Sequence, residues 1–222
     1  MNRSVNDAMG PILVFFPKML FATIVAIEVA VFGILVSWVC GLVVALLKTS
    51  PSRLLRWPAE IFIWFMRGAP PLMLVLFVYF GIRQTGVALT PFVGGVVALG
   101  LASAGFVAEI IRSGLKAIPK GQWESSTAIG MGYLTALRRV ILPQVVRIII
   151  PALGNESINT LKNTSLLSAI TVVELTFYTQ GVVASTFRPF EFYILAAFIY
   201  LALTTVISQA IAWYERRNDL GM

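Results

Sequence analysis

Long apolar runs separated by short polar segments make up most of this 222-residue chain. A helix that crosses the hydrocarbon core of a bilayer needs about 20 mostly apolar residues. Five runs reach that length, at residues 19–47, 59–80, 92–111, 148–170 and 190–213. The pattern therefore predicts an all-α membrane protein: a single domain over residues 1–222 with five transmembrane helices.

The longest segment that cannot lie in a bilayer is residues 112–147, between the third and fourth predicted spans. Within it we expect two short helices, over residues 122–129 and 133–142. Gly130 lies between them, and glycine permits the positive φ that a tight turn needs. The segment therefore predicts a two-helix elbow outside the membrane.

Two other segments depart from a simple spanning pattern. Pro70 and Pro71 fall inside the second predicted span, next to Arg67. Proline lacks a backbone donor and disfavours helix just before it, so a helix break is expected there. Residues 171–189 are too polar to cross alone and predict an amphipathic surface segment.

Composition supports a membrane location. The chain is 58% hydrophobic and 12% charged, whereas soluble domains carry about 25% charged residues. Histidine is absent, which removes the usual general base near neutral pH and the commonest metal ligand. The single cysteine, Cys40, excludes an intrachain disulfide. The first 18 residues lack the pattern of a cleaved signal peptide, so we expect them to be retained.

The formal net charge of +7 is explained by topology. Cytoplasmic loops of membrane proteins are enriched in Lys and Arg. Four of these residues lie on one predicted side: Arg3, Lys18, Arg83 and Arg188. Eleven lie on the other: Lys48, Arg53, Arg56, Arg112, Lys116, Lys120, Arg138, Arg139, Arg147, Arg216 and Arg217. The central loop and the C-terminus are therefore predicted to be cytoplasmic and the N-terminus external, and no nucleic-acid partner is needed.

The central loop carries a recognisable motif. Glu124-Ser125-Ser126 is followed by three residues, Gly130, nine residues and then Val140-Ile141-Leu142-Pro143. This arrangement resembles the EAA signature of ABC-importer permeases, with serines in place of both alanines and valine in place of isoleucine. Further segments are similar to those of polar amino-acid permeases: residues 67–72, 106–114, 118–124, 142–144, 151–156 and 161–166. The resemblance covers roughly residues 20–215.

The resemblance implies the type I ABC-importer permease fold in a bacterial inner membrane. It implies a second permease copy or homologue, two cytoplasmic ATPases, an external substrate-binding protein and an amino-acid substrate. The chain contains no Gly-x4-Gly-Lys-Ser/Thr phosphate loop, so we expect a transporter subunit that is not itself an enzyme. It would bind no cofactor, with ATP and Mg on the ATPases. The residues expected to couple to the ATPases are Glu124, Ser125, Ser126 and Gly130.

The fourth predicted span carries a polar face. At 100° per residue its polar side chains fall within an arc of about 120°, formed by Asn155, Glu156, Asn159, Lys162 and Asn163. An ionisable group at membrane depth costs at least ~2.5 kcal/mol, so it usually faces a cavity or a partner. One interpretation is internal: a Glu156–Lys162 pair, with Asn–Asn bonds between helices.

The other interpretation is a substrate site. Lys162, with Thr164 and Ser165, would bind the carboxylate of an amino acid, while Glu156 and Asn159 would bind its ammonium or a polar side chain. Arg67 also has two interpretations, since interrupted helices often mark transporter sites but the arginine could instead bond carbonyls freed at a kink. Glu109 and Arg112 predict a structural pair three residues apart.

Two other functions stay open at this point. An ion-coupled secondary amino-acid transporter could use Glu156 and Lys162 as a relay. A non-transporting membrane scaffold could use the basic central loop to recruit a cytoplasmic protein.

Overall fold

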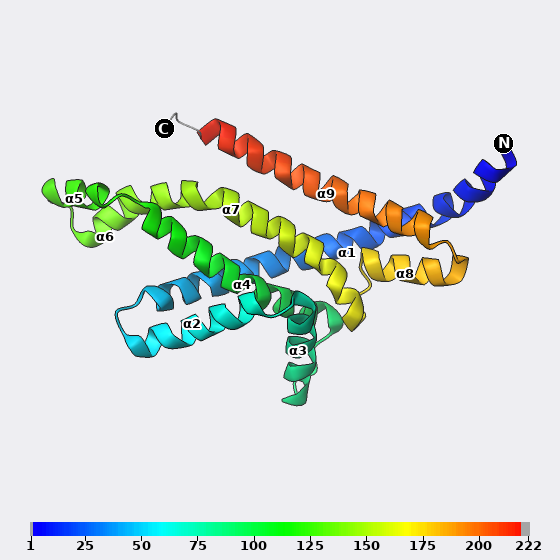
Figure 1. The fold of residues 1–222 in the computed structure, drawn as a ribbon, viewed down its shortest axis with the longest axis horizontal. Helices are drawn as coiled ribbons and strands as arrows, with labels where there is room; N and C mark the ends of the chain where they lie inside the picture. The colour runs from blue at the N-terminus through cyan, green and yellow to red at the C-terminus, as the bar shows by residue number, and fades with distance from the viewer. Residues whose placement is uncertain (1, 219–222) are drawn as a thin grey trace.

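The computed structural model describes residues 2–218, and over them the chain is built from helices and short connections (Figure 1). The all-α prediction is confirmed. In chain order the elements are α1 (Asn2–Thr49), α2 (Arg53–Gly68), α3 (Pro71–Gln84), α4 (Pro91–Ala117), α5 (Lys120–Ala128), α6 (Tyr133–Ala136), a π-helical turn (Leu137–Ile141), α7 (Leu142–Asn163), a 3₁₀ segment (Thr164–Ile170), α8 (Leu175–Thr186) and α9 (Pro189–Asn218).

Helix α4 is the centre of the fold, because it contacts α1, α2, α3 and α7. Its contact with α1 depends on small residues, as is common between membrane helices. A methyl group placed on Gly41 of α1 would lie 2.5 Å from Cγ1 of Val107 and 3.1 Å from the carbonyl oxygen of Ala104. Gly100 of α4 faces Val36 of α1 just as closely. The two backbones therefore approach closely only because glycine occupies these positions.

Replacing Gly41 with leucine is expected to lower the free energy of unfolding by about 1–3 kcal/mol, the usual cost of overpacking a core. The atoms in the way are a β-branched side chain and a backbone carbonyl, neither of which can swing aside. Thermal denaturation of the detergent-purified protein measures the change. Gly81→Leu in α3 is the matched control, because no atom lies within 4 Å of a Cβ added there. Equal melting temperatures for Gly41→Leu and the parent chain would contradict the packing account.

The predicted break beside Arg67 is confirmed. Ala69 and Pro70 have extended backbones, and α3 begins at Pro71, where a missing N–H is tolerated. The helices on either side of the break are bent by 119° relative to each other. Residues 59–80 are therefore not one straight span, because α3 turns away from α2 (Figure 1).

The number of membrane crossings stays a prediction. Among the described residues, three helices are long and apolar enough to cross a membrane alone: Gly10–Thr49, Pro91–Ala117 and Pro189–Arg217. The count reaches five if each of two bent helix pairs forms one span. The second pair joins Tyr133–Ile170 to Leu175–Thr186 with a bend of 51°.

The segment predicted as amphipathic, residues 171–189, contains α8. One face of α8 is buried, through Leu175, Thr179 and Val182. Leu175 and Val182 form a cluster with Met19 of α1 and Phe192 of α9. Helix α8 therefore holds the start of α9 against the first half of α1.

Candidate functional site

The elbow (residues 120–136) ends its first helix in a glycine turn. Gly130 has φ +80°, a left-handed conformation that favours glycine. Its N–H donates to the carbonyl of Thr127 at 2.9 Å, and the N–H of Met131 donates to the carbonyl of Ser126 at 3.0 Å. This pair of bonds is a Schellman motif, which satisfies the last carbonyls of α5. The positive φ expected at Gly130 is confirmed.

Side-chain contacts fix the two arms of the elbow to each other. The rings of Trp123 and Tyr133 stack with centroids 5.3 Å apart. The amide of Gln144 on α7 donates to the side-chain oxygen of Gln122 at 3.1 Å. The elbow is thus tied both across its turn and to the helix that leads into the core.

The predicted coupling residues present different faces. Glu124, Ser125 and Gly130 are exposed, whereas Ser126 is buried and its hydroxyl donates to the carbonyl of Gln122 at 2.7 Å. Beside them, Ile129 is 73% exposed and Leu134 is 70% exposed. Large apolar side chains left this open on a polar hairpin are typical of a protein-docking surface.

The second arm of the elbow differs from the prediction of a short helix ending at residue 142. Helix α6 runs through the π-helical turn directly into α7, so the helical path does not stop there. Pro143 has no N–H to donate. The turn before it is widened, and the N–H of Leu142 donates to the carbonyl of Leu137, five residues back. The second arm of the elbow and α7 therefore form one continuous helical path.

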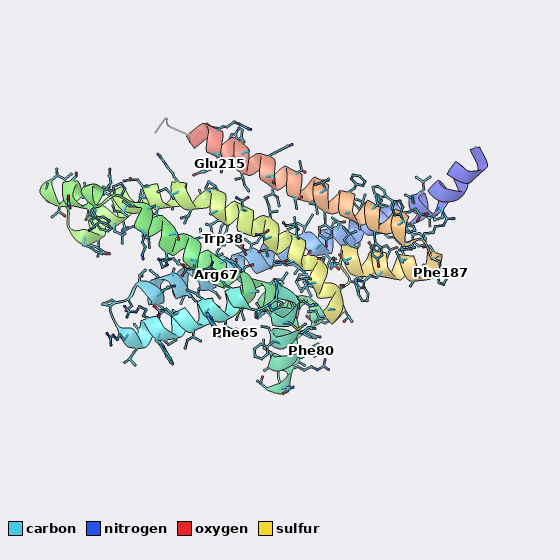
Figure 2. The ribbon with its side chains drawn as sticks, viewed as in Figure 1. Trp38, Phe65, Arg67, Phe80, Phe187 and Glu215 are labelled. Carbon is cyan, nitrogen blue, oxygen red and sulfur yellow. The ribbon has the colours of Figure 1, made fainter. Side chains whose placement is uncertain are left out.

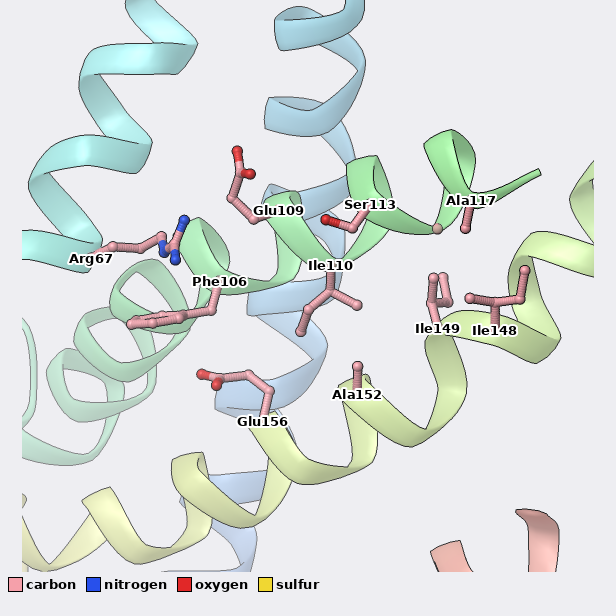
Figure 3. Close-up of a pocket in the computed structure, with 11 residues that line it drawn as sticks. Arg67, Phe106, Glu109, Ile110, Ser113, Ala117, Ile148, Ile149, Ala152 and Glu156 are labelled. Carbon is pink, nitrogen blue, oxygen red and sulfur yellow. The ribbon is translucent and has the colours of Figure 1, made fainter. Parts of the chain in front are cut away.

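A pocket of about 390 Å³ opens between α4 and α7. Arg67 reaches it from the end of α2, and the α4 side is formed in part by Phe106, Glu109 and Ser113. The α7 side is Ile148, Ile149, Ala152 and Glu156. Figure 3 shows Arg67 and Glu156 at the same end of the pocket as Phe106, with the Glu156 side chain reaching from α7 toward the aromatic ring. The pocket thus combines an apolar wall with charges of both signs.

Within the described residues, two of these charged side chains, Arg67 and Glu156, form no ion pair. The guanidinium carbon of Arg67 lies 5.4 Å from the centroid of the Phe106 ring, a cation–π geometry. The side-chain amide of Asn159 donates to Glu156 at 3.5 Å. Within residues 2–218, no ion pair joins Glu156 to Lys162. The internal-pair interpretation is therefore not realised in this conformation.

The third charge of the pocket is neutralised. Glu109 pairs with Arg112 at 2.6 Å, which confirms the predicted structural pair. It also pairs with Lys48, the last basic residue of α1, at 2.5 Å. Nothing in the sequence indicated this second partner, since Lys48 and Glu109 are 61 residues apart. This cluster fastens α1 to α4 at the end of the pair nearest the elbow.

The other predicted substrate residues lie outside the pocket lining. Lys162 is exposed, and Ser165 donates its hydroxyl to the Lys162 carbonyl at 2.8 Å. Thr164 is fully buried and donates to the carbonyl of Leu161 at 2.7 Å. The structure therefore brings Glu156 and Asn159 together and places Arg67 and Phe106 beside Glu156. The Thr164 hydroxyl is already hydrogen-bonded within the protein. The substrate assignments themselves stay predictions.

A buried polar network that sequence reasoning missed surrounds Thr164. Glu174 is 0% exposed and caps α8 by accepting from the N–H groups of Thr176 and Phe177, each at 2.8 Å. The hydroxyl of Tyr200 on α9 donates to Glu174 at 2.8 Å and lies 3.3 Å from the hydroxyls of Thr164 and Thr176. The network joins the end of α7 to α8 and α9.

Tyr200→Phe is expected to lower the free energy of unfolding by about 1–3 kcal/mol, because it leaves a buried carboxylate with one fewer donor. The aromatic ring and its packing stay in place, so the change isolates the hydroxyl. Thermal denaturation in detergent measures the effect. Tyr193→Phe, on the exposed side of the same helix, is the matched control. If the two variants have the same melting temperature, the hydroxyl of Tyr200 contributes nothing to stability.

The comparisons with known proteins identify the family. The family described as "Binding-protein-dependent transport system inner membrane component" matches residues 33–219. The chain belongs to this family.

Relatives of this permease carry consistent descriptions. The probable glutamine ABC transporter permease protein GlnM of Bacillus subtilis is 34% identical over 90% of this chain and 91% of its own length. The arginine ABC transporter permease protein ArtQ of Escherichia coli is 33% identical over 93% of this chain and 94% of its own. The predicted resemblance to amino-acid ABC permeases is confirmed.

Solved structures agree with the fold. The crystal structure of an amino acid ABC transporter with histidines matches with a TM-score of 0.87 and 35% identity, over 93% of this permease and 96% of that chain. An inward-facing form of the MetNI methionine ABC transporter matches with a TM-score of 0.67 at 17% identity, which shows the fold alone. This chain is a multi-pass membrane protein with the fold of ABC-importer permeases.

Proposed function

We propose that this permease forms half of the translocation pathway of an ATP-driven importer for polar amino acids. The second half is another copy of the chain or a homologue. Two cytoplasmic ATPases bind ATP and Mg and dock on the elbow, and an external binding protein delivers the substrate. In this arrangement the N-terminus is external and the C-terminus cytoplasmic. The observation that carries the proposal is a charged pocket between α4 and α7. Helix α7 is the one that continues from the elbow.

The proposed substrate site is built on Glu156 and Asn159, with Lys162 and Ser165 one to two turns further along the chain. An amino acid presents an ammonium and a carboxylate at once, and a site for it needs groups of both signs. Glu156 supplies an acceptor for the ammonium or for a cationic side chain, and Arg67 is a second candidate, besides Lys162, for binding the carboxylate. Since Glu109 is already paired with Lys48 and Arg112, Glu156 is the carboxylate of the pocket that is left to meet a substrate cation. A carboxylate in that role favours zwitterionic or cationic substrates over acidic ones.

The test is to purify the chain from its native membrane in mild detergent and identify what accompanies it by mass spectrometry. We expect a P-loop ATPase in equal amount, and a co-purifying homologue if the pathway is heteromeric. Uptake into cells should stop when ATP is depleted. A chain purified without any nucleotide-binding partner, or uptake that survives ATP depletion and collapses with an uncoupler, would overturn the proposal.

A further inference from the structure

A second cleft lies at the start of α2, far along that helix from the substrate pocket. It has a volume of about 540 Å³ and is lined by Arg53, Leu54, Arg56, Trp57, Pro58 and Glu60. We propose that this cleft binds the head group of an anionic phospholipid from the leaflet on the elbow side of the membrane. The inference does not depend on which substrate the permease carries.

The positive charge in the cleft is available to a ligand. In the part of the chain that the structure describes, Arg53 takes part in no ion pair or side-chain hydrogen bond. Arg56 lies 3.7 Å from Glu60, and both side chains are more than two-fifths exposed. Exposed pairs of this kind hold each other weakly. Two guanidinium groups three residues apart on one helix can therefore bind a phosphate, which suits their forked geometry.

The surroundings of the two arginines suit a lipid better than a free phosphate. Leu54 is 86% exposed and Trp57 is 68% exposed. The apolar surface continues up the helix through Ile61 and Trp64, which are 43% and 74% exposed. Residues 57, 61 and 64 are spaced as neighbours on one helix face. A lipid whose head group lies at the arginines would thus have its acyl chains beside the apolar track formed by Trp57, Ile61 and Trp64.

The exposed face is not needed to hold α2 in place. Ala59, Ile63 and Met66 are buried on the opposite side of the helix. Tryptophan is enriched where membrane and water meet, so Trp57 next to Arg53 and Arg56 marks that boundary. The exposed apolar side chains beside the two arginines favour lipid over a soluble protein as the occupant, since a phospholipid carries an anionic head group and apolar chains in the same molecule.

The test uses the purified protein in micelles that contain equal amounts of phosphatidylcholine and phosphatidylglycerol, with native mass spectrometry to count the lipids retained. We expect preferential retention of phosphatidylglycerol. Arg53→Gln with Arg56→Gln should lower its occupancy at least five-fold. The matched control is Lys116→Gln with Arg147→Gln, which removes the same charge from two other exposed positions on the same predicted side. That control should keep the parent occupancy.

Two further measurements distinguish a bound lipid from a free phosphate. Dihexanoyl phosphatidylglycerol, whose chains are too short to follow the track, should bind at least five-fold more weakly than the long-chain lipid. Inorganic phosphate at millimolar concentration should not displace the long-chain lipid. The proposal fails if the glutamine pair retains as much phosphatidylglycerol as the parent, if the control pair loses as much, or if phosphate alone competes. If the protein with both glutamine substitutions does not fold, Arg53→Lys with Arg56→Lys replaces it. This variant keeps the charge but loses the forked donors, and it should lower phosphatidylglycerol occupancy at least two-fold. Parent-like occupancy in the lysine variant would equally overturn the proposal.

Discussion

Replacement of Gly130 by valine is expected to reduce ATP-driven uptake at least ten-fold while the protein remains in the membrane. The residue has φ +80°, and a left-handed residue with a side chain costs roughly 1–2 kcal/mol, with β-branched residues the least suited. No atom lies within 4 Å of an added Cβ, so the effect comes from the backbone and not from a clash. The turn relaxes by giving up the two bonds that close α5, and the surface around Glu124 moves with it.

Gly132 provides the matched control in the same turn. Its φ is −67° with an extended ψ, which valine adopts readily, and a Cβ there also meets nothing within 4 Å. Uptake of labelled amino acid, membrane abundance and the amount of co-purifying ATPase should be measured for both variants. We expect Gly132→Val to behave as the parent. Parent-like uptake in Gly130→Val would remove the elbow from the coupling path.

Features fixed by neighbouring residues could be predicted from the sequence. The break beside Arg67 follows from two consecutive prolines, and the turn at Gly130 follows from a glycine between two short helical patterns. The Glu109–Arg112 pair likewise joins residues about one helical turn apart. In each case the physical cause lies within a few residues, so no knowledge of the packing was required.

Features fixed by packing could not be predicted. The 119° change of direction between α2 and α3 depends on how both helices contact α4. The partnership of Lys48 with Glu109 depends on how α1 packs along α4. Thr164 looked available for a substrate because it lies in a polar stretch of sequence. In the structure its hydroxyl is hydrogen-bonded to the carbonyl of Leu161 and lies beside the hydroxyl of Tyr200 on α9. A helical wheel shows which residues share a face, not what covers that face.

The same limit applies to the pocket between α4 and α7. The polar stripe of the fourth predicted span includes Glu156, which lines the pocket. It could not reveal that Phe106 would be part of the wall, or that Arg67 would approach this end of the pocket from α2 (Figure 3). Those contacts join three helices that are remote in sequence.

Glu156→Gln is expected to weaken transport of cationic amino acids at least ten-fold more than transport of neutral ones. Hydrogen bonds to a charged group contribute about 1.5–3 kcal/mol, and each 1.4 kcal/mol is a factor of about ten in affinity. Glutamine matches the size of glutamate and can still accept from Asn159, so the pocket keeps its shape and loses only its charge. The cation of the substrate then lacks its partner, whereas an amide side chain can still form hydrogen bonds.

Uptake of labelled arginine, lysine and glutamine into proteoliposomes that contain the complete transporter measures this selectivity, with KM and the maximal rate determined separately. The loss should fall on KM, because the substitution acts on binding and leaves the elbow unchanged. Glu215→Gln is the matched control, since that residue is exposed near the end of α9, away from the pocket (Figure 2). An equal loss for all three substrates would place the carboxylate against the ammonium that they share. Unchanged KM values for all three would remove Glu156 from the site and leave the pocket as a route without a specific contact on α7.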